Sequence, residues 1–142
     1  TAVGAKEIFQ YPIFGQLITL YGGVPIIRTH LKSALKSLQY VEEAINKGVS
    51  FIIAPEGTRT LTGELSPFKK GPFHLAKNTG ITIVPIALIG GLEAKSKNDW
   101  RLKPGILTTR FGTPITQEEY GHLKVEEISD LVREQIEDLI KA

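Results

Sequence analysis

The sequence predicts an α/β fold in which a mostly parallel sheet is flanked by helices. Short apolar runs typical of buried strands alternate along the chain with longer segments whose apolar residues recur at helical spacing. This alternation is typical of parallel sheets, because parallel strands are joined through helices. A chain of 142 residues, 42% of them hydrophobic, is long enough for one domain with its own core. We therefore expect a single domain over residues 1–142.

The first half of the chain is expected to contain three strands and two helices. The long helix is the clearest of these, because Leu31, Leu35 and Leu38 fall on one helical face and Gly48 follows as a terminator. The expected elements are, in order, the end of a strand at 3–9, an apolar helix at 12–23, a strand at 24–28, the long helix capped by Thr29, and a strand at 49–54.

The second half is expected to begin with a polar loop and to end with an amphipathic helix. The strongest strand signal of the chain is ITIVPIALIG, and the last segment, VEEISDLVREQIEDLIKA, places its apolar residues on one helical face. The expected elements are a helix at 71–79 closed by Gly80, a strand at 81–90, a charged loop, a strand at 106–115, and the amphipathic helix at 125–142.

Composition narrows the classes of function. The formal charge is only +2, and no aromatic and basic platform stands out, so nucleic acid is not an expected partner. The chain has no cysteine and three separated histidines, so we expect no metal site. No apolar run reaches the roughly 18 residues that indicate a membrane-spanning helix.

The stretch FIIAPEGTRT, residues 51–60, runs from a buried strand directly into polar chemistry. Ligands of open α/β sheets gather at the carboxyl ends of strands, where Glu56, Gly57, Thr58 and Arg59 stand. Gly57 allows a sharp turn, and the guanidinium of Arg59 offers paired donors that suit a phosphate. Glu56 is expected to orient the arginine or to accept a substrate hydroxyl. The alternative is a surface turn in which Glu56 and Arg59 simply pair.

Basic residues elsewhere support an anion site. Arg28 ends the strand at 24–28, and Lys6 stands at the end of the first strand. Lys69 and Lys70 precede the helix at 71–79, whose first amides also favour an anion. Together these cations predict a site for a phosphate-like group, whereas each lysine alone is more typical of a solvated surface.

Other catalytic and binding motifs are absent from the sequence. There is no phosphate-binding P-loop, no G-x-G-x-x-G dinucleotide fingerprint, and no G-x-S-x-G nucleophile elbow. An unrelated nucleotide-binding α/β domain is therefore disfavoured. His30, His74 and His122 are each expected to be capping, packing or surface residues rather than catalytic ones, since none has an aspartate five positions later.

Four stretches, in order, resemble the motifs of the lysophosphatidic acid acyltransferases, the glycerophospholipid acyltransferase family. They are AKEIFQYPIFG (5–15), GGVPIIR (22–28), FIIAPEGTRT (51–60) and ITIVPIALIG (81–90, with Pro85 at its centre), and FKKG (68–71) also fits. The likeness covers residues 3 to about 115. In the second motif the family usually has Asp-Arg; here Ile27 replaces the aspartate and Arg28 is retained.

The resemblance implies an enzyme of phospholipid biosynthesis that makes phosphatidic acid. In the family, a His-x-x-x-x-Asp dyad takes a proton from the acceptor hydroxyl, which then attacks the thioester of acyl-CoA or acyl carrier protein; no other cofactor is implied. The resemblance assigns the acceptor's phosphate and glycerol to Glu56, Gly57, Thr58 and Arg59, with help from Arg28, Lys6 and Lys70. Pro85 would shape the neighbouring strand.

This sequence departs from the family in one respect: it contains no His-x-x-x-x-Asp. The resemblance places that dyad just before residue 1, so we expect an N-terminally truncated chain that is inactive by itself. The family's membrane anchor is also N-terminal, which implies a full-length protein held, peripherally or by an anchor, at the cytoplasmic face of a membrane. The alternative is an acyltransferase-like module that binds a lipid phosphate without catalysis.

Overall fold

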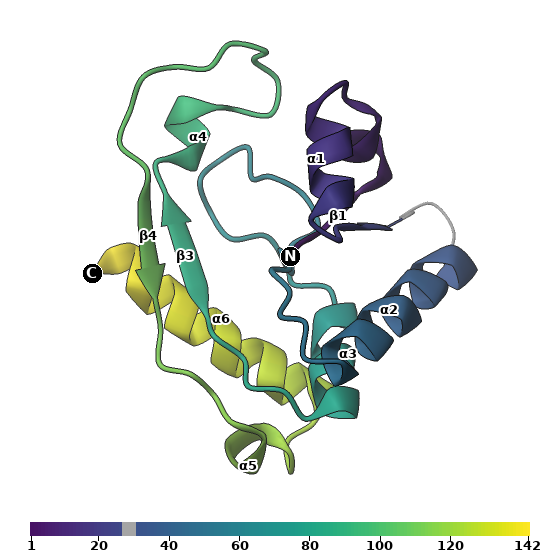
Figure 1. The fold of residues 1–142 in the computed structure, drawn as a ribbon. Helices are drawn as coiled ribbons and strands as arrows, with labels where there is room; N and C mark the ends of the chain where they lie inside the picture. The colour runs from purple at the N-terminus through teal and green to yellow at the C-terminus, as the bar shows by residue number, and fades with distance from the viewer. Residues whose placement is uncertain (27–30) are drawn as a thin grey trace. The chain divides into compact units, whose positions relative to one another are not determined.

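The computed structural model describes residues 1–26 and 31–142. These residues form two compact units, Thr1–Ala54 and Pro55–Ala142, which we describe one at a time (Figure 1). The single domain expected from the sequence stays a prediction. Arg28 and His30 lie outside the described residues.

The first unit is built around a small parallel sheet. Strand β1 (Val3–Ala5) pairs in parallel with β2 (Val24–Ile26), with Val3 opposite Val24. On its other side β1 is extended by a parallel bridge between Ala2 and Ile52. Each return to the sheet passes through a helix, as parallel pairing requires. The predicted α/β class with a parallel sheet is confirmed.

Two of the strands expected in the first unit are shorter than the sequence indicated. The run 49–54 contributes only Ile52, whose amide donates to the carbonyl of Thr1 at 2.8 Å and whose carbonyl accepts from Val3 at 3.1 Å. The run 3–9 leaves the sheet after Ala5 and continues as the 3-10 helix η1 (Lys6–Gln10). Apolar runs therefore predicted the position of these segments, but hydrogen-bond partners limited their length.

Two helices complete the first unit. Helix α1 (Phe14–Leu20) is shorter than the expected 12–23, and α2 (Leu31–Asn46) matches the long predicted helix. Among the residues of α2 whose burial is described, Val41 and Ile45 are buried, as is Val24 of β2. The Ser37 hydroxyl donates to the carbonyl of Pro25 at 3.1 Å, which connects α2 to the strand.

The second unit packs helices against an antiparallel strand pair. Strand β3 (Ile86–Ile89) runs antiparallel to β4 (Thr108–Phe111), with Ile86 opposite Phe111. The alternation of elements did not indicate this antiparallel pair; it arises because the chain returns through a loop rather than through a long helix. In Figure 1 helix α6 (Val125–Lys141) runs alongside both strands. The remaining helices are α3 (Gly71–Thr79), as predicted, and the short, unpredicted α4 (Gly91–Ala94) and α5 (Gln117–Tyr120).

The core of the second unit centres on Tyr120 and Ile128, which have no exposed surface. Phe73 and Ala76 from α3, and Val132 and Ile136 from α6, are buried around them. The hydroxyl of Tyr120 lies 2.9 Å from the carbonyl oxygen of Ala76 and 2.6 Å from that of Ile81, so this polar group is satisfied inside the core. Burial raises the pKa of this phenol above its ordinary value.

Candidate functional site

The polar residues after Ala54 lie on a closed loop, residues 55–69, called here the motif loop. The amide of Lys69 donates to the carbonyl of Pro55 at 2.8 Å and closes the loop at its base. Inside the loop, the amide of Ser66 donates to the carboxylate of Glu56 at 2.8 Å. These two hydrogen bonds fix the backbone at Pro55 and Glu56, where the residues that follow Glu56 begin.

Gly57 turns the backbone at the start of the motif loop. Its φ is +72°, in the left-handed region that side-chain-bearing residues avoid. A Cβ built on Gly57 would approach Cγ of Lys69 at 3.7 Å, an ordinary contact. Conformation, rather than lack of space, therefore explains glycine at this position, as the sequence indicated.

Thr58 and Arg59 are exposed beyond this turn. Lys97 donates from Nζ to the hydroxyl of Thr58 at 3.1 Å, which brings a second cation to the motif loop from far along the chain. Arg59 makes no hydrogen bond or ion pair with any described residue. Its guanidinium donors are therefore available to a ligand from solvent.

The Glu56–Arg59 ion pair of the surface-turn alternative is not observed among the described residues. Glu56 instead accepts the Ser66 amide, so its carboxylate is occupied by the loop's own backbone. This gives Glu56 a structural role in the turn. Its second carboxylate oxygen still has capacity to accept from another donor.

Arg133 of α6 supports the far side of the motif loop. Its guanidinium donates to the carbonyls of Ser66 and Leu65, both at 3.0 Å, and forms a 2.8 Å ion pair with Glu137. The same group lies 5.4 Å from the ring centre of Phe68, within cation–π range. A single planar side chain thus holds two carbonyls and one ring of the loop.

Lys70 forms an ion pair with a residue of α6. It precedes α3, and its Nζ lies 2.6 Å from the carboxylate of Glu126 at the start of α6. The Lys70 ammonium holds the pKa of Glu126 below its ordinary value. Both side chains are more than half exposed, so the pair is open to solvent. The predicted role of Lys70 in substrate binding remains a prediction.

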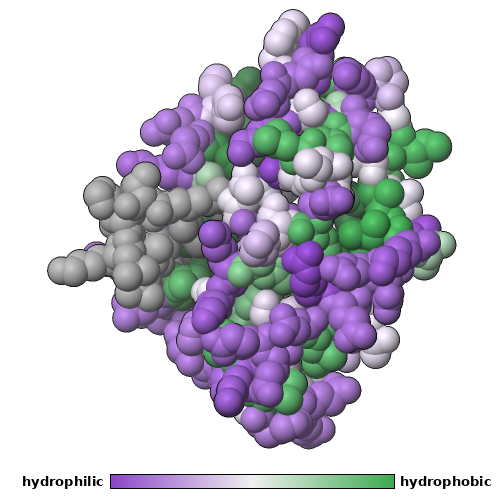
Figure 2. All heavy atoms as spheres, turned by 180° about the vertical axis from the view of Figure 1, so that it is seen from behind, coloured by the Kyte–Doolittle hydropathy of each residue, from purple (hydrophilic) through white to green (hydrophobic). Residues whose placement is uncertain are grey.

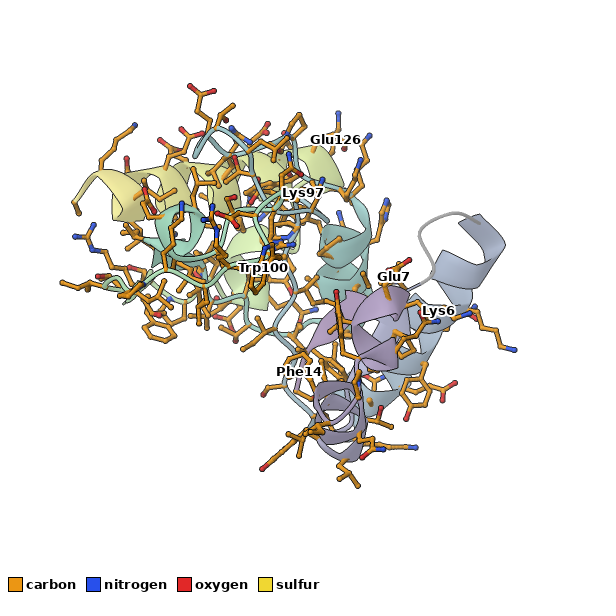
Figure 3. The ribbon with its side chains drawn as sticks, turned by 90° about the horizontal axis from the view of Figure 1, so that it is seen from above. Lys6, Glu7, Phe14, Lys97, Trp100 and Glu126 are labelled. Carbon is orange, nitrogen blue, oxygen red and sulfur yellow. The ribbon has the colours of Figure 1, made fainter. Side chains whose placement is uncertain are left out.

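The other predicted binding residues fall in different surroundings. Lys6 is exposed at the start of η1, and Figure 3 shows its side chain extending away from the helix. Pro85 is fully buried just before β3, and its carbonyl accepts from the amide of Gly112 at 2.8 Å. Its surroundings are those of a packing residue; its predicted effect on a substrate would be indirect.

The described histidines are surface residues. His74 is exposed on α3, and His122 is exposed between α5 and α6. Neither forms a hydrogen bond with an aspartate in the part of the chain that the structure describes. The motif loop therefore offers anion-binding donors and hydroxyls, but no described histidine beside it acts as a general base.

Lys97 and Arg133 were not predicted from the sequence as site residues. Lys97 lies in a loop rich in charge, and Arg133 lies among the charged residues of an amphipathic helix; both patterns are typical of solvated surfaces. Only the fold brings them to residues 58 and 65–66. Two hollows, of about 430 and 470 Å³, are lined by residues of the first unit.

Comparison with known proteins connects this geometry to a family. A coconut (Cocos nucifera) 1-acyl-sn-glycerol-3-phosphate acyltransferase is 38% identical over 131 residues, which are 92% of this chain and 42% of the relative. An enzyme of the same name from Salmonella typhimurium is 32% identical, covering 97% of this chain and 56% of its own length. The chain therefore spans about half the length of these curated relatives.

A chloroplastic relative and a solved structure extend the likeness. The Arabidopsis thaliana 1-acyl-sn-glycerol-3-phosphate acyltransferase LPAT1, chloroplastic, is 42% identical over 88 residues, 62% of this chain and 25% of its own length. The crystal structure of the 1-acyl-sn-glycerophosphate acyltransferase PlsC from Thermotoga maritima matches with a TM-score of 0.82 at 24% identity. It covers 97% of this chain and 54% of PlsC, and confirms the fold.

None of the helices that the structure describes is both long enough and apolar enough to cross a membrane.

The family assignment rests on the part of the chain that carries the motifs. The family model described as Acyltransferase matches residues 1–89, which include β1, β2 and the whole motif loop. Because that match covers more than half of the sequence, the chain belongs to the Acyltransferase family.

Proposed function

We propose that this chain forms the acceptor-binding part of an enzyme that acylates lysophosphatidic acid, producing phosphatidic acid for phospholipid synthesis. The acyl donor is acyl-CoA or acyl carrier protein, used as a co-substrate, and no further cofactor takes part. The names of the relatives support this acceptor, since they are 1-acyl-sn-glycerol-3-phosphate acyltransferases. The fold that this chain shares with PlsC, which spans 54% of the PlsC chain, supports the proposal that the chain is one part of a larger enzyme.

The observation that carries the proposal is that the Arg59 side chain is exposed and unpaired among the described residues. This arginine is exposed and has no partner among the described residues, on a loop whose backbone is fixed from both sides by Glu56 and Arg133. An unpaired guanidinium on a supported loop is suited to a phosphate, because little conformational freedom of the loop is lost on binding. The Thr58 hydroxyl and Lys97 add a second hydrogen-bonding group and a second positive charge.

The chemical step needs a base that the described residues do not supply. We assign it to a His-x-x-x-x-Asp dyad outside these 142 residues, as the family resemblance implies. The histidine removes the proton of the acceptor hydroxyl, and the oxygen attacks the thioester carbonyl carbon. The carbon–sulfur bond then breaks, the acyl group stays on the acceptor as an ester, and the leaving thiolate takes up a proton.

We place the complete protein at the cytoplasmic face of a membrane, attached peripherally or by an anchor. The acceptor and the product are lipids, so the enzyme must work at a bilayer surface. Two of the relatives are chloroplastic by name, and that location is a statement about those proteins.

The test is acceptor dependence in Arg59 variants of the protein encoded by the whole gene. Arg59→Ala should lower kcat/KM for lysophosphatidic acid. The loss of transition-state stabilisation should be about 1.5–3 kcal/mol, the scale of a charge-assisted hydrogen bond. Arg59→Lys should recover part of the loss, because it keeps the charge but not the paired donors. Transfer to monoacylglycerol, which has no phosphate, should be unaffected.

The control is Lys141→Ala, which removes an exposed positive charge at the end of α6. Equal use of lysophosphatidic acid by Arg59→Ala and Lys141→Ala, with both variants folded, would refute the role of Arg59. Binding of lysophosphatidic acid without transfer, in the chain and in the whole-gene protein alike, would instead identify the non-catalytic module.

A further inference from the structure

A second loop of the second unit, residues 95–107, follows α4 and is called here the tryptophan loop. Its base is closed by the amide of Lys103, which donates to the carbonyl of Ala94 at 2.8 Å. Within it, Lys95 donates from Nζ to the carbonyl of Asp99, and Arg101 donates to the Asp99 carboxylate at 3.0 and 3.2 Å. These bonds give the loop a defined shape without a hydrophobic core of its own.

The tryptophan loop exposes more apolar surface than a solvated loop needs. Trp100, the only tryptophan of the chain, is 87% exposed, more than any other large hydrophobic side chain among the described residues. Leu102, Ile106 and Leu107 of the same loop are 78%, 86% and 57% exposed. Seen from behind, hydrophobic side chains also gather on the side of the second unit where β3 and β4 lie (Figure 2). Exposed apolar groups gathered in one loop favour a partner that removes them from water.

The charges of the loop define what kind of partner fits. Lys95, Lys97, Arg101 and Lys103 are basic, and Asp99 is the only acidic residue in this segment. The Asp99 carboxylate already accepts from Arg101, and Lys103 Nζ lies 3.6 Å from it. Those cations hold the pKa of Asp99 below its ordinary value, so the carboxylate is charged and paired. The loop thus presents a net positive charge around its apolar side chains.

We propose that the tryptophan loop docks the protein onto the surface of an anionic lipid bilayer. Trp100 and the aliphatic side chains enter the boundary between headgroups and acyl chains, where tryptophan is favoured because it combines an apolar body with one N–H donor. The lysines and the arginine contact lipid phosphates, and each adds to the attraction of an anionic surface. Aliphatic side chains beside the tryptophan favour lipid over nucleic acid, whose bases stack on aromatic rings.

The tryptophan loop is connected to the motif loop by a hydrogen bond. Lys97, from the same loop as Trp100 (Figure 3), bonds to Thr58 of the motif loop. Because this bond joins the two loops, docking of the tryptophan loop at the bilayer also places the motif loop close to the bilayer surface. This inference goes beyond the proposed function, because it concerns binding to lipid that is not a substrate.

The experiment uses the single tryptophan as its probe. The 142-residue chain is titrated with vesicles of phosphatidylcholine containing phosphatidylglycerol, and with vesicles of phosphatidylcholine alone; neither contains lysophosphatidic acid. With anionic vesicles, Trp100 emission should shift to shorter wavelength, and lipids brominated on their acyl chains should quench it. Pure phosphatidylcholine should bind about tenfold or more weakly, and added salt should weaken binding to anionic vesicles.

Co-sedimentation of variants tests which residues are responsible. Trp100→Ala should weaken vesicle binding about tenfold, the scale of one large apolar side chain returned to water, and Leu61→Ala, a change at an exposed leucine of the motif loop, should not. Lys103→Gln should weaken binding more than Lys141→Gln, which removes the same charge from the end of α6. Arg59→Ala should weaken vesicle binding far less than Trp100→Ala, because it removes one charge and no apolar side chain, whereas it should abolish most of the preference for a phosphorylated acceptor.

Three outcomes would overturn the proposal. The first is sedimentation with vesicles while Trp100 emission neither shifts nor is quenched, because another surface would then bind the lipid. The second is equal binding to neutral and anionic vesicles. The third is binding of a single-stranded oligonucleotide with no binding of vesicles. In none of these cases does the result decide whether the protein acylates lysophosphatidic acid, so the two proposals fail independently.

Discussion

The amide of Ser66 donates a 2.8 Å hydrogen bond to the carboxylate of Glu56, ten residues earlier in the chain. The bond ties the polar residues that follow the first unit to the return segment of their own loop. Glu56 therefore fixes the shape of the motif loop, while Arg59, three residues on, remains free of partners among the described residues. Within one motif, one charged residue supports the loop and another is available to bind.

Replacing Glu56 should separate these two roles. Glu56→Ala leaves the half-buried Ser66 amide without its acceptor and should cost about 1 kcal/mol of stability. Glu56→Gln keeps an acceptor oxygen at the same place and should cost less. Hydrogen exchange of the Ser66 amide is the direct measurement: it should accelerate in Glu56→Ala and change little in Glu56→Gln. Equal exchange in both variants would show that the bond does not support the loop.

Gly57 should be replaceable only at the cost of a strained backbone. Gly57→Ala should lose about 1–2 kcal/mol of unfolding free energy, because φ of +72° is unfavourable for alanine while its Cβ has room. The matched control is Gly63→Ala in the same loop. Gly63 has a φ of +89°, and a Cβ built on it would lie 3.5 Å from Cδ2 of Leu92, an ordinary contact. Urea unfolding should give similar losses for both variants. A fall in use of lysophosphatidic acid should appear for Gly57→Ala alone.

Arg133 should contribute more to stability than its ion pair with Glu137 does. Arg133→Met removes donors to the carbonyls of Ser66 and Leu65 and should cost about 1.5–3 kcal/mol, as expected for hydrogen bonds to a charged group. Glu137→Gln removes only the partly exposed i,i+4 pair and should cost less than about 0.5 kcal/mol. Chemical denaturation of both variants makes the comparison. A similar loss in the two would mean that Arg133 acts only through Glu137.

Tyr120 should make the fold sensitive to alkaline pH. Burial raises the pKa of its phenol above 10.0, so the folded state retains the proton at a pH where the unfolded state loses it. The stability this group contributes is complete below pH 10 and is lost as pH rises through the folded pKa. Tyr120→Phe should be about 1 kcal/mol less stable at pH 8, since two carbonyls lose their donor. The difference between the two proteins, measured by thermal unfolding, should persist up to about pH 10 and shrink as the pH rises further; a constant difference would contradict this account.

The sequence predicted helices better than strands, for a physical reason. Helix α3 begins and ends at the predicted residues, because its hydrogen bonds are local and Gly80 ends it. The run 49–54 is as apolar as a buried strand, but only Ile52 finds partners, in Thr1 and Val3. Strand length depends on neighbours from elsewhere in the chain, and no local pattern contains that information.

The candidate site was predictable to a similar extent. The motif at 56–59 was located from its residue types, and Gly57 adopts the turn expected of it. Nothing in the local pattern around Lys97 or Arg133 assigned them to the motif loop, since both look like solvated charges. Conversely, Lys70 looked available to an anion but pairs with Glu126, a residue of a helix that begins far beyond it. Each of these contacts joins residues far apart in the sequence, so no local pattern contains it.

Arg133 also bears on where a working fragment of this protein could end. The family match stops at residue 89, whereas the guanidinium that holds the motif loop comes from α6. A fragment trimmed to the matched region would keep the first three motifs and all but the last residue of the fourth, but it would lose the support of the motif loop by Arg133 and the buried side chains of α6. The end of the family-model match is therefore not the end of the packed unit, and the last helix must be kept in any minimal version of the motif loop.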